Sequence, residues 1–251
     1  MNRYFLEVRY KGTNYAGFQK QQNAPTIQSA IEAALAVYFR TAVELTGSSR
    51  TDTGVHAFQN YFHFDIDQLV KQESVYNLNA LLPPDIAVTN LIRVKAEQHC
   101  RFDAIARTYL YRIYQQKDPF LNGLAYYFPF KPDLELLQEA AAVIKDEVDF
   151  VAFSKRNTQV KHFRCMIKES RWEEEGPCLV YRVQANRFLR GMVKGLVGTM
   201  LQVGRGNMQL DVFRGLFKNG DEARVDFSVP GHGLILKEVN YPKGFFDEGV
   251  K

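Results

Sequence analysis

Residues 47–57 read GSSRTDTGVHA and separate two strand-like segments near residues 43–45 and 58–64. The stretch combines an acid, a base and several hydroxyl groups with almost nothing apolar to bury. Thr51-Asp52-Thr53-Gly54 has turn chemistry, because Asp can cap its own backbone and Gly accepts a positive φ. Arg50 and Asp52 are two positions apart, so an extended backbone would project both side chains from one face. The residues alone leave open whether this loop is only a turn or also an active site.

The segments around this loop alternate between strand and helix patterns. Thr26 is a plausible N-cap for the first helix, and Pro83-Pro84 ends the second. The expected strands lie at 4–10, 43–45, 58–64 and 86–94, and the expected helices at 27–38 and 69–82. This β-α-β-β-α-β order is the ferredoxin-like pattern.

The second half of the chain is expected to repeat the unit with insertions, although the two halves share no residue-level similarity. Its expected strands lie at 104–114, 166–172, 179–185 and 234–239, and its expected helices at 132–145, 188–203 and 210–217. We therefore predict an α+β fold with two ferredoxin-like halves, 1–100 and 101–251. Docked side by side, they would form a continuous mixed or antiparallel sheet with helices on one face and a central cleft.

Composition restricts the class of protein without identifying it. The chain has 251 residues, 46% of them hydrophobic and 24% charged, and a formal net charge of +4. This charge permits a polyanionic partner without requiring one. The three cysteines are far apart and form no C-x-x-C pair, and the histidines show no metal-ligand spacing. No apolar run approaches the length of a membrane span, and MNRYFLEVRYKG resembles a strand rather than a signal peptide. We expect a soluble, cytoplasmic protein without a metal.

GSSRTDTGVHA closely resembles the R-T-D-x-G-V-H signature of the tRNA pseudouridine synthase A family. YKGTNYAGFQKQ, from Tyr10, is similar to an opening element of that family. Four further stretches follow in the family's order and spacing, namely NALLPPDIAV, HCRFDAIARTYLYRI, ANRFLRGMVKGLVGTMLQVG and HGLILKEVNYP. The resemblance therefore covers nearly the whole chain.

The resemblance implies a cofactor-free isomerase that flips a uridine out of the RNA and rejoins its uracil to the ribose through C5. Asp52 matches the family's catalytic aspartate, the expected nucleophile, although attack on ribose C1′, addition to uracil C6 and proton abstraction all stay open. Arg50 matches the arginine that pairs with the aspartate and fills the space of the flipped nucleotide. Tyr109 matches the active-site tyrosine, and Leu234 a leucine of the uracil pocket. Lys194 stands where the family usually has an arginine, so it supplies charge without a bidentate fork.

The implied substrate is the tRNA anticodon stem-loop, with the family acting on uridines 38–40 as a homodimer and without a membrane. The central cleft is then expected to bind RNA. A basic segment beside aromatic residues, 153–164, is the best local RNA-binding candidate, and phosphate contacts would supply affinity rather than sequence reading. The individual candidate RNA contacts are Gln19, Arg107, Arg187 and Arg190.

Two other functions stay open at this point. The same fold could be a noncatalytic module that binds or folds RNA. A carboxylate glycosidase is a third possibility, but that chemistry normally needs two carboxylates across the bond. Asp52 has no partner carboxylate in any of the matching motifs.

Overall fold

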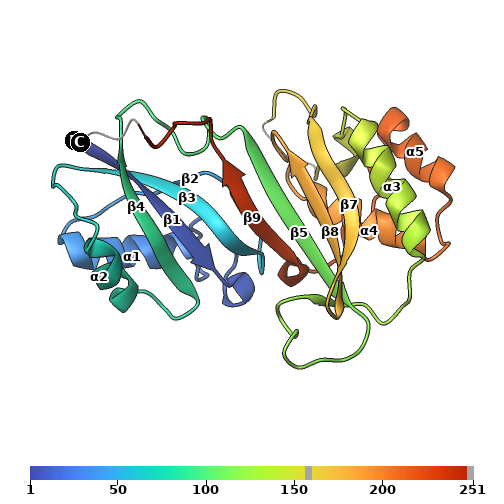
Figure 1. The fold of residues 1–251 in the computed structure, drawn as a ribbon, viewed down its shortest axis with the longest axis horizontal. Coiled ribbons are helices and arrows are strands. Elements are labelled where there is room, and N and C mark those ends of the chain that lie inside the picture. The colour runs from blue at the N-terminus through green and yellow to red at the C-terminus, as the bar shows by residue number, and fades with distance from the viewer. Residues whose placement is uncertain (156–159, 248–251) are drawn as a thin grey trace. The chain divides into compact units, whose positions relative to one another are not determined.

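The computed structural model describes residues 1–155 and 160–247 and divides the chain into two compact units (Figure 1). Unit 1 comprises Met1–Ile105 and Leu236–Lys251, and unit 2 comprises Ala106–Ile235. The division expected at residue 100 differs in the C-terminal segment. This segment returns to unit 1 because β9 (Leu234–Asn240) is hydrogen-bonded beside β3. Both units combine helices with a sheet, so the predicted α+β class is confirmed.

Unit 1 is a sheet with two α-helices. Its strands follow the order β4-β1-β3-β9, and the two-residue strand β2 pairs with β3. The pairs of β1 with β3 and with β4 are both antiparallel. The elements are β1 (Asn2–Tyr10), η1 (Gly12–Asn14), α1 (Ile27–Phe39), β2 (Thr46–Gly47), β3 (His56–Ile66), α2 (Ser74–Leu81) and β4 (Ile86–Val94). Fully buried aromatic residues of β1 and β3 form much of its core.

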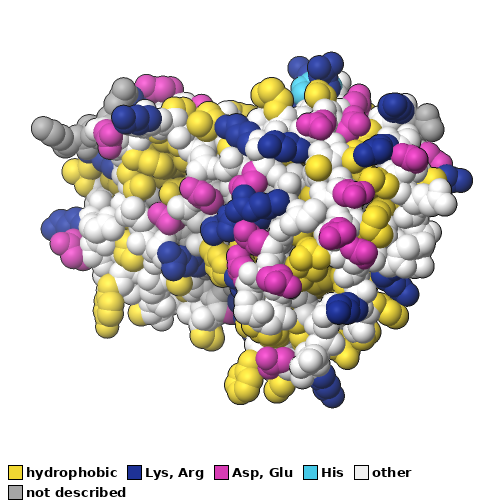
Figure 2. Space-filling view, turned by 45° about the vertical axis from the view of Figure 1, so that its right-hand side comes forward, with side chains coloured by type: hydrophobic (Ala, Val, Ile, Leu, Met, Phe, Trp, Pro, Cys, Tyr) yellow, Lys and Arg dark blue, Asp and Glu magenta, His cyan; other side chains and the backbone are white. Residues whose placement is uncertain are grey.

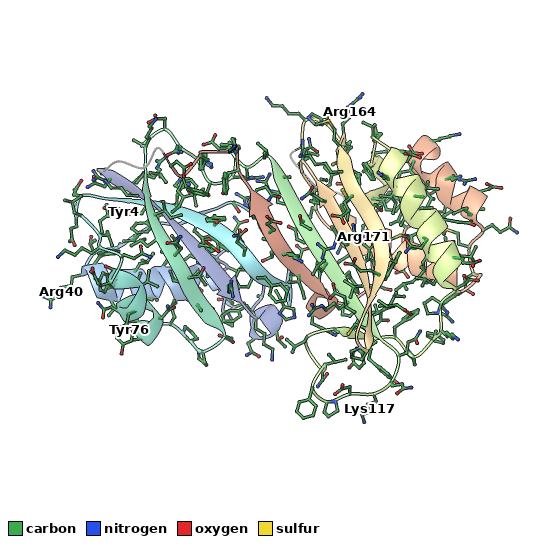
Figure 3. The ribbon with its side chains drawn as sticks, in the orientation of Figure 1. Tyr4, Arg40, Tyr76, Lys117, Arg164 and Arg171 are labelled. Carbon is green, nitrogen blue, oxygen red and sulfur yellow. The ribbon has the colours of Figure 1, made fainter. Side chains whose placement is uncertain are left out.

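Helix α1 begins and ends where local chemistry dictates. The Thr26 hydroxyl accepts a hydrogen bond from the backbone N–H of Ser29, and the Ser29 side chain accepts one from the backbone of Thr26. This reciprocal capping satisfies donors that the first turn would otherwise leave unpaired. Ile31 and Leu35 bury one face of the helix, and Arg40, labelled in Figure 3, ends it with a φ of +56°. The predicted cap at Thr26 is confirmed.

Two local predictions in unit 1 are wrong. Helix α2 begins at Ser74 rather than residue 69, and in the segment before it the N–H of Val70 donates 2.9 Å to the hydroxyl of Tyr4. The strand expected at 43–45 instead occupies Thr46–Gly47. Side chains of α1 hold residue 45: the Leu45 N–H donates to the Glu32 carboxylate and its carbonyl accepts from Gln28. In both places the chain contacts a segment that is distant in sequence.

Unit 2 contains the remaining helices and a mixed set of strand pairs. Strand β8 pairs antiparallel with β5 and β7, whereas the short β6 pairs parallel with β5. The elements are β5 (Ala106–Tyr114), β6 (Tyr126–Tyr127), α3 (Leu134–Asp146), η2 (Val151–Phe153), β7 (Ile167–Glu175), β8 (Cys178–Ala185), α4 (Met192–Gly204), α5 (Leu210–Asn219), η3 (Glu222–Arg224) and η4 (Gly231–Gly233). A cluster of aromatic rings, Phe150, Phe153, Phe213 and Phe217, joins η2 to α5.

Helix α4 starts later than the sequence predicts. It begins at Met192 rather than residue 188, because Gly191 at its N-cap has a φ of +74° and turns the chain. Within the helix, a Cβ on Gly198 would lie 2.1 Å from the backbone oxygen of Asp226. The backbone of α4 therefore approaches that of Asp226 too closely for a side chain at Gly198. The four residues 188–191 are left as a loop.

Charge on the surface is mixed in sign. Figure 2 shows acidic and basic side chains intermingled on the face that it presents. On β7 and β8, for example, Arg171, labelled in Figure 3, and Arg182 form ion pairs with Glu173. Among the described residues, no helix is long and apolar enough to cross a membrane.

Candidate active site

The loop between β2 and β3 presents Arg50 and Asp52 to solvent. Ser49 and Thr51 are buried, and Arg50 and Asp52, which flank Thr51, are exposed. This alternation supports the expectation that the Arg50 and Asp52 side chains share a face. The buried residues Ser49 and Thr51 anchor the loop, and the charged side chains of Arg50 and Asp52 remain accessible to solvent.

The turn at Asp52 is closed by backbone atoms. The N–H of Val55 donates 3.2 Å to the carbonyl oxygen of Asp52, and Gly54 has a φ of +78°. Within the described part of unit 1, no hydrogen bond or ion pair engages the Asp52 carboxylate or joins it to Arg50. The Asp52 carboxylate therefore takes no part in stabilising the turn. Pairing of Arg50 with Asp52 stays a prediction.

The segment after β1 supports the loop by close backbone contact. The N–H of Phe18 donates 2.9 Å to the carbonyl oxygen of Thr51, and the N–H of Gly54 donates 3.3 Å to that of Tyr15. A Cβ on Gly12 would lie 2.0 Å from the carbonyl oxygen of Val55. These contacts explain why YKGTNYAGFQKQ accompanies the loop, since any side chain at Gly12 would displace it.

His56 and Gln19 lie at opposite extremes of burial. His56 is 4% exposed, and its Nδ1 accepts a hydrogen bond from the N–H of Gly12 at 2.9 Å. This contact gives it a structural role at the start of β3. Gln19 is exposed in the segment between η1 and α1.

Two residues that the sequence does not single out lie against the loop. Tyr10, at the end of β1, and Asn60, within β3, contact it with buried polar groups. A usable signal for Asn60 is an amide side chain within the aromatic-rich run FQNYFHF. For Tyr10 the signal is its place at the start of YKGTNYAGFQKQ, although a tyrosine at a strand end is by itself ordinary.

Unit 2 places Tyr109 beside the loop that precedes α4. Tyr109 lies on β5, half-buried, and its ring meets Phe188 edge to face with centroids 5.0 Å apart. On the same strand, the guanidinium of Arg107 donates 3.3 Å to the carbonyl oxygen of Asn186. Arg187 is next in the chain and contacts His162 through its guanidinium. Unit 2 therefore brings Arg107, Tyr109 and residues 186–188 together.

Arg190 and Lys194 lie on either side of the α4 N-terminus. Arg190 is exposed, and its carbonyl oxygen accepts a hydrogen bond from the N–H of Lys155 at 3.0 Å. The Lys155 chain packs against Gly191, and its ammonium group lies 5.9 Å from the centre of the Phe227 ring. Lys194 is half-buried in the first turn of the helix. Lys155 belongs to the basic segment 153–164, of which residues 156–159 lie outside the described part.

Leu234 begins β9 and is 7% exposed. Tyr111 fixes the turn before it, since its hydroxyl donates 2.8 Å to the carbonyl oxygen of Pro230. A Cβ on Gly233 would lie 2.6 Å from the Tyr111 ring. Tyr111 is thus a core residue, whereas the role of Leu234 in a uracil pocket stays a prediction.

A histidine and cysteine cluster also occurs in unit 1. Ligand-type atoms of His63, His99 and Cys100 lie within 4.8 Å of one another. Each residue is already used: His63 Nδ1 accepts from the Cys100 N–H, His99 Nδ1 from the Arg101 N–H, and the Cys100 thiol donates to a backbone carbonyl. Metal binding through either nitrogen of these rings would disrupt those bonds, because a neutral ring bound at Nε2 carries its proton on Nδ1. The cluster therefore stabilises the local backbone through hydrogen bonds and is not a preformed metal site.

Comparison with known proteins adds a family match. A model of tRNA pseudouridine synthases matches residues 7–103 and 147–242. A tRNA pseudouridine synthase A of Parabacteroides distasonis is 44% identical over 249 residues, which cover 98% of each chain. That of Porphyromonas gingivalis is 41% identical and covers 98% of this chain and 100% of its own. That of Staphylococcus aureus is 35% identical, over 94% and 91% of the two chains.

Proposed function

The chain belongs to the tRNA pseudouridine synthase family, and we propose that Asp52 is the carboxylate on which its reaction depends. The protein is an isomerase that converts uridine in tRNA to pseudouridine. The observation that carries the proposal is the pattern of burial in the β2–β3 loop. Its buried residues, Ser49 and Thr51 among them, hold the turn, and its two charged residues, Arg50 and Asp52, are exposed.

The reaction needs a group that can act on a uridine after the base has left the stack. The bond between ribose C1′ and uracil N1 breaks, C1′ bonds to C5, the hydrogen of C5 leaves and N1 gains a proton. An ionised carboxylate can attack C1′, add to C6 or take a proton, and each of these roles requires an accessible oxygen. Extruding the base costs a few kcal/mol, which the enzyme must recover by binding the flipped nucleotide. Arg50, exposed two positions from Asp52, is suited to filling the vacated space.

Residues of unit 2 are proposed to act on the same uridine. The half-buried ring of Tyr109 can stack on uracil and place its hydroxyl near the leaving proton of C5. Lys194 supplies positive charge for the carboxylate, and Leu234 contributes an apolar wall to the uracil site. The support for these roles is the match of Tyr109 and Leu234 to the family's motifs, and the position of Lys194 where the family usually has an arginine.

The finer identity of the substrate also belongs to the proposal. We infer that the enzyme acts at positions 38–40 of the anticodon stem-loop, as a homodimer built from ferredoxin-like halves with a central RNA-binding cleft. In unit 1, the strand order β4-β1-β3 with β2 on β3 supports the ferredoxin-like reading. The basic side chains of Arg107, Arg187 and Arg190, with the amide of Gln19, are candidate phosphate and sugar contacts.

The test is release of tritium from a tRNA transcript labelled at uracil C5, because isomerisation must expel that hydrogen. We expect release by the wild type and none by Asp52→Ala or Asp52→Asn. Asp67→Asn is the matched control, since Asp67 is also an exposed aspartate of unit 1. Binding of tRNA without release by the wild type would favour a noncatalytic RNA-binding module. Base-free sites in the RNA would instead indicate a glycosidase.

A further inference from the structure

A network of buried polar side chains lies beneath the β2–β3 loop. At its centre, Asn60 is 0% exposed. Its Nδ2 group donates to the Ser49 carbonyl and to the Tyr10 hydroxyl, each at 3.1 Å. Its Oδ1 accepts from the Ser48 hydroxyl at 2.8 Å and from the N–H of Tyr61 at 3.0 Å. The amide therefore uses both donors and both acceptor positions, which fixes its orientation.

Tyr10 carries the network from Asn60 to the loop. Its hydroxyl lies 2.8 Å from the hydroxyl of Thr51, and both residues are buried. Because the phenol oxygen already accepts from Asn60, its own proton is available for Thr51. Burial raises the pKa of Tyr10 to about 12, so this proton is retained at neutral pH.

The two contact points of the network bracket Arg50. One is the carbonyl of Ser49 and the other is the side chain of Thr51, the residue before Asp52. Arg50 and Asp52 themselves are exposed and take no part. A buried polar network costs free energy unless every member is paired, and here two of the pairs hold Ser49 and Thr51, the residues on either side of Arg50.

We propose that Tyr10 and Asn60 are positioning residues that hold Asp52 in its reactive geometry through Ser49 and Thr51. This inference rests on the proposed role of Asp52. A displacement of a reacting group by about 1 Å can slow a reaction by about 100-fold, so a small shift of the loop would be visible in the rate.

The experiment compares Tyr10→Phe with Tyr181→Phe under single-turnover conditions and in steady state. Tyr181 is an equally buried tyrosine of unit 2, with its hydroxyl 2.8 Å from that of Ser170. Tyr10→Phe loses two buried hydrogen bonds, with Thr51 and Asn60, and Tyr181→Phe loses one with Ser170, so the control shows what the loss of a buried hydroxyl does to the rate away from the loop. For Tyr10→Phe we expect kcat to fall about tenfold while KM for tRNA is unchanged. For Tyr181→Phe we expect both constants to match the wild type.

A double variant tests whether the effect passes through Thr51. If Tyr10 acts on the loop through that hydroxyl, Tyr10→Phe combined with Thr51→Val should be no slower than the slower single variant. Additive losses, or a wild-type kcat for Tyr10→Phe, would overturn the inference while Asp52→Ala is still inactive. Activity in Asp52→Ala would instead contradict the proposed function, whatever Tyr10→Phe does.

Discussion

A Cβ on Gly17 would lie 2.8 Å from the carbonyl oxygen of Thr51. That oxygen also accepts the N–H of Phe18, and Gly17 itself has a φ of +98°. Two stretches of backbone thus meet without room for a side chain. This contact between Gly17 and Thr51 supports the loop that contains Asp52.

Gly17→Ala is therefore expected to lower the free energy of unfolding by about 2–3 kcal/mol, because strain and overlap with backbone add together. The rate of isomerisation should fall more than tenfold as the loop shifts. Urea unfolding and tritium release measure the two effects.

Gly176→Ala is the control for this prediction. Gly176 also has a positive φ, +57°, but nothing lies within 4 Å of its Cβ position. Only the conformational strain of about 1 kcal/mol should remain, with normal activity. Equal losses of stability in the two variants would contradict the role given to the Thr51 contact.

Stability should depend on pH through His63. Burial lowers the pKa of His63 to about 4, and the nearby Arg3 and His99 act in the same direction. The unfolded chain, with a histidine pKa near 6.5, then binds more protons than the folded one between pH 6.5 and 4. This contribution to stability is complete above pH 6.5 and is lost as the pH falls, by about 2 kcal/mol between pH 7 and 5.

Unfolding free energies of the wild type and His63→Gln at pH 7 and 5 test this dependence. The variant should lose less stability on acidification, because glutamine does not titrate and can still accept the N–H of Cys100. His162→Gln, at an exposed position, should keep the wild-type difference. An unchanged pH dependence in His63→Gln would show that other groups control acid stability.

The parts of the fold that could be predicted are those set by local chemistry. The cap at Thr26 and the apolar face of the helix that follows are both specified by residues close together in the sequence, and the structure contains both. The starts of α2 and α4 could not be predicted in this way. The segment before α2 is bonded through Val70 to the Tyr4 hydroxyl of β1, and α4 begins after the positive φ of Gly191.

The residues of the candidate site also fall into those that local sequence predicts and those that it does not. Arg50 and Asp52 belong to one short motif, so sequence alone proposes them. Tyr10 and Asn60 meet only because β1 pairs with β3, with Val8 opposite Asn60 and a register shift between Val8 and Tyr10. Such a contact depends on strand register and a bulge, which no local pattern specifies.

Lys194 offers a test of charge against geometry. Lys194→Ala should slow isomerisation by roughly 100-fold, since it removes the positive charge that the proposal assigns to the catalytic carboxylate. Lys194→Arg should keep the rate within about threefold of the wild type, because the charge is preserved. Single-turnover rates measure both, and Lys168→Ala, at an exposed lysine of β7, is the control. Inactivity of the arginine variant would show that the site is built for the lysine geometry.

Tyr109 is predicted to have two separable functions. Tyr109→Phe keeps the ring and its contact with Phe188, so tRNA affinity should be unchanged. If the hydroxyl assists proton transfer at C5, the single-turnover rate of this variant should fall about 100-fold. Tyr109→Leu removes the ring as well, and loss of base stacking should weaken tRNA binding by about tenfold. Filter binding and tritium release measure the two quantities.

Tyr114→Phe is the control, because Tyr114 lies on the same strand but on its opposite face. Both its rate and its affinity should match the wild type. A wild-type rate in Tyr109→Phe would exclude a role for the hydroxyl while leaving the stacking intact. Unchanged affinity in Tyr109→Leu would exclude the stacking, and Tyr109 would then be a packing residue between β5 and the loop before α4.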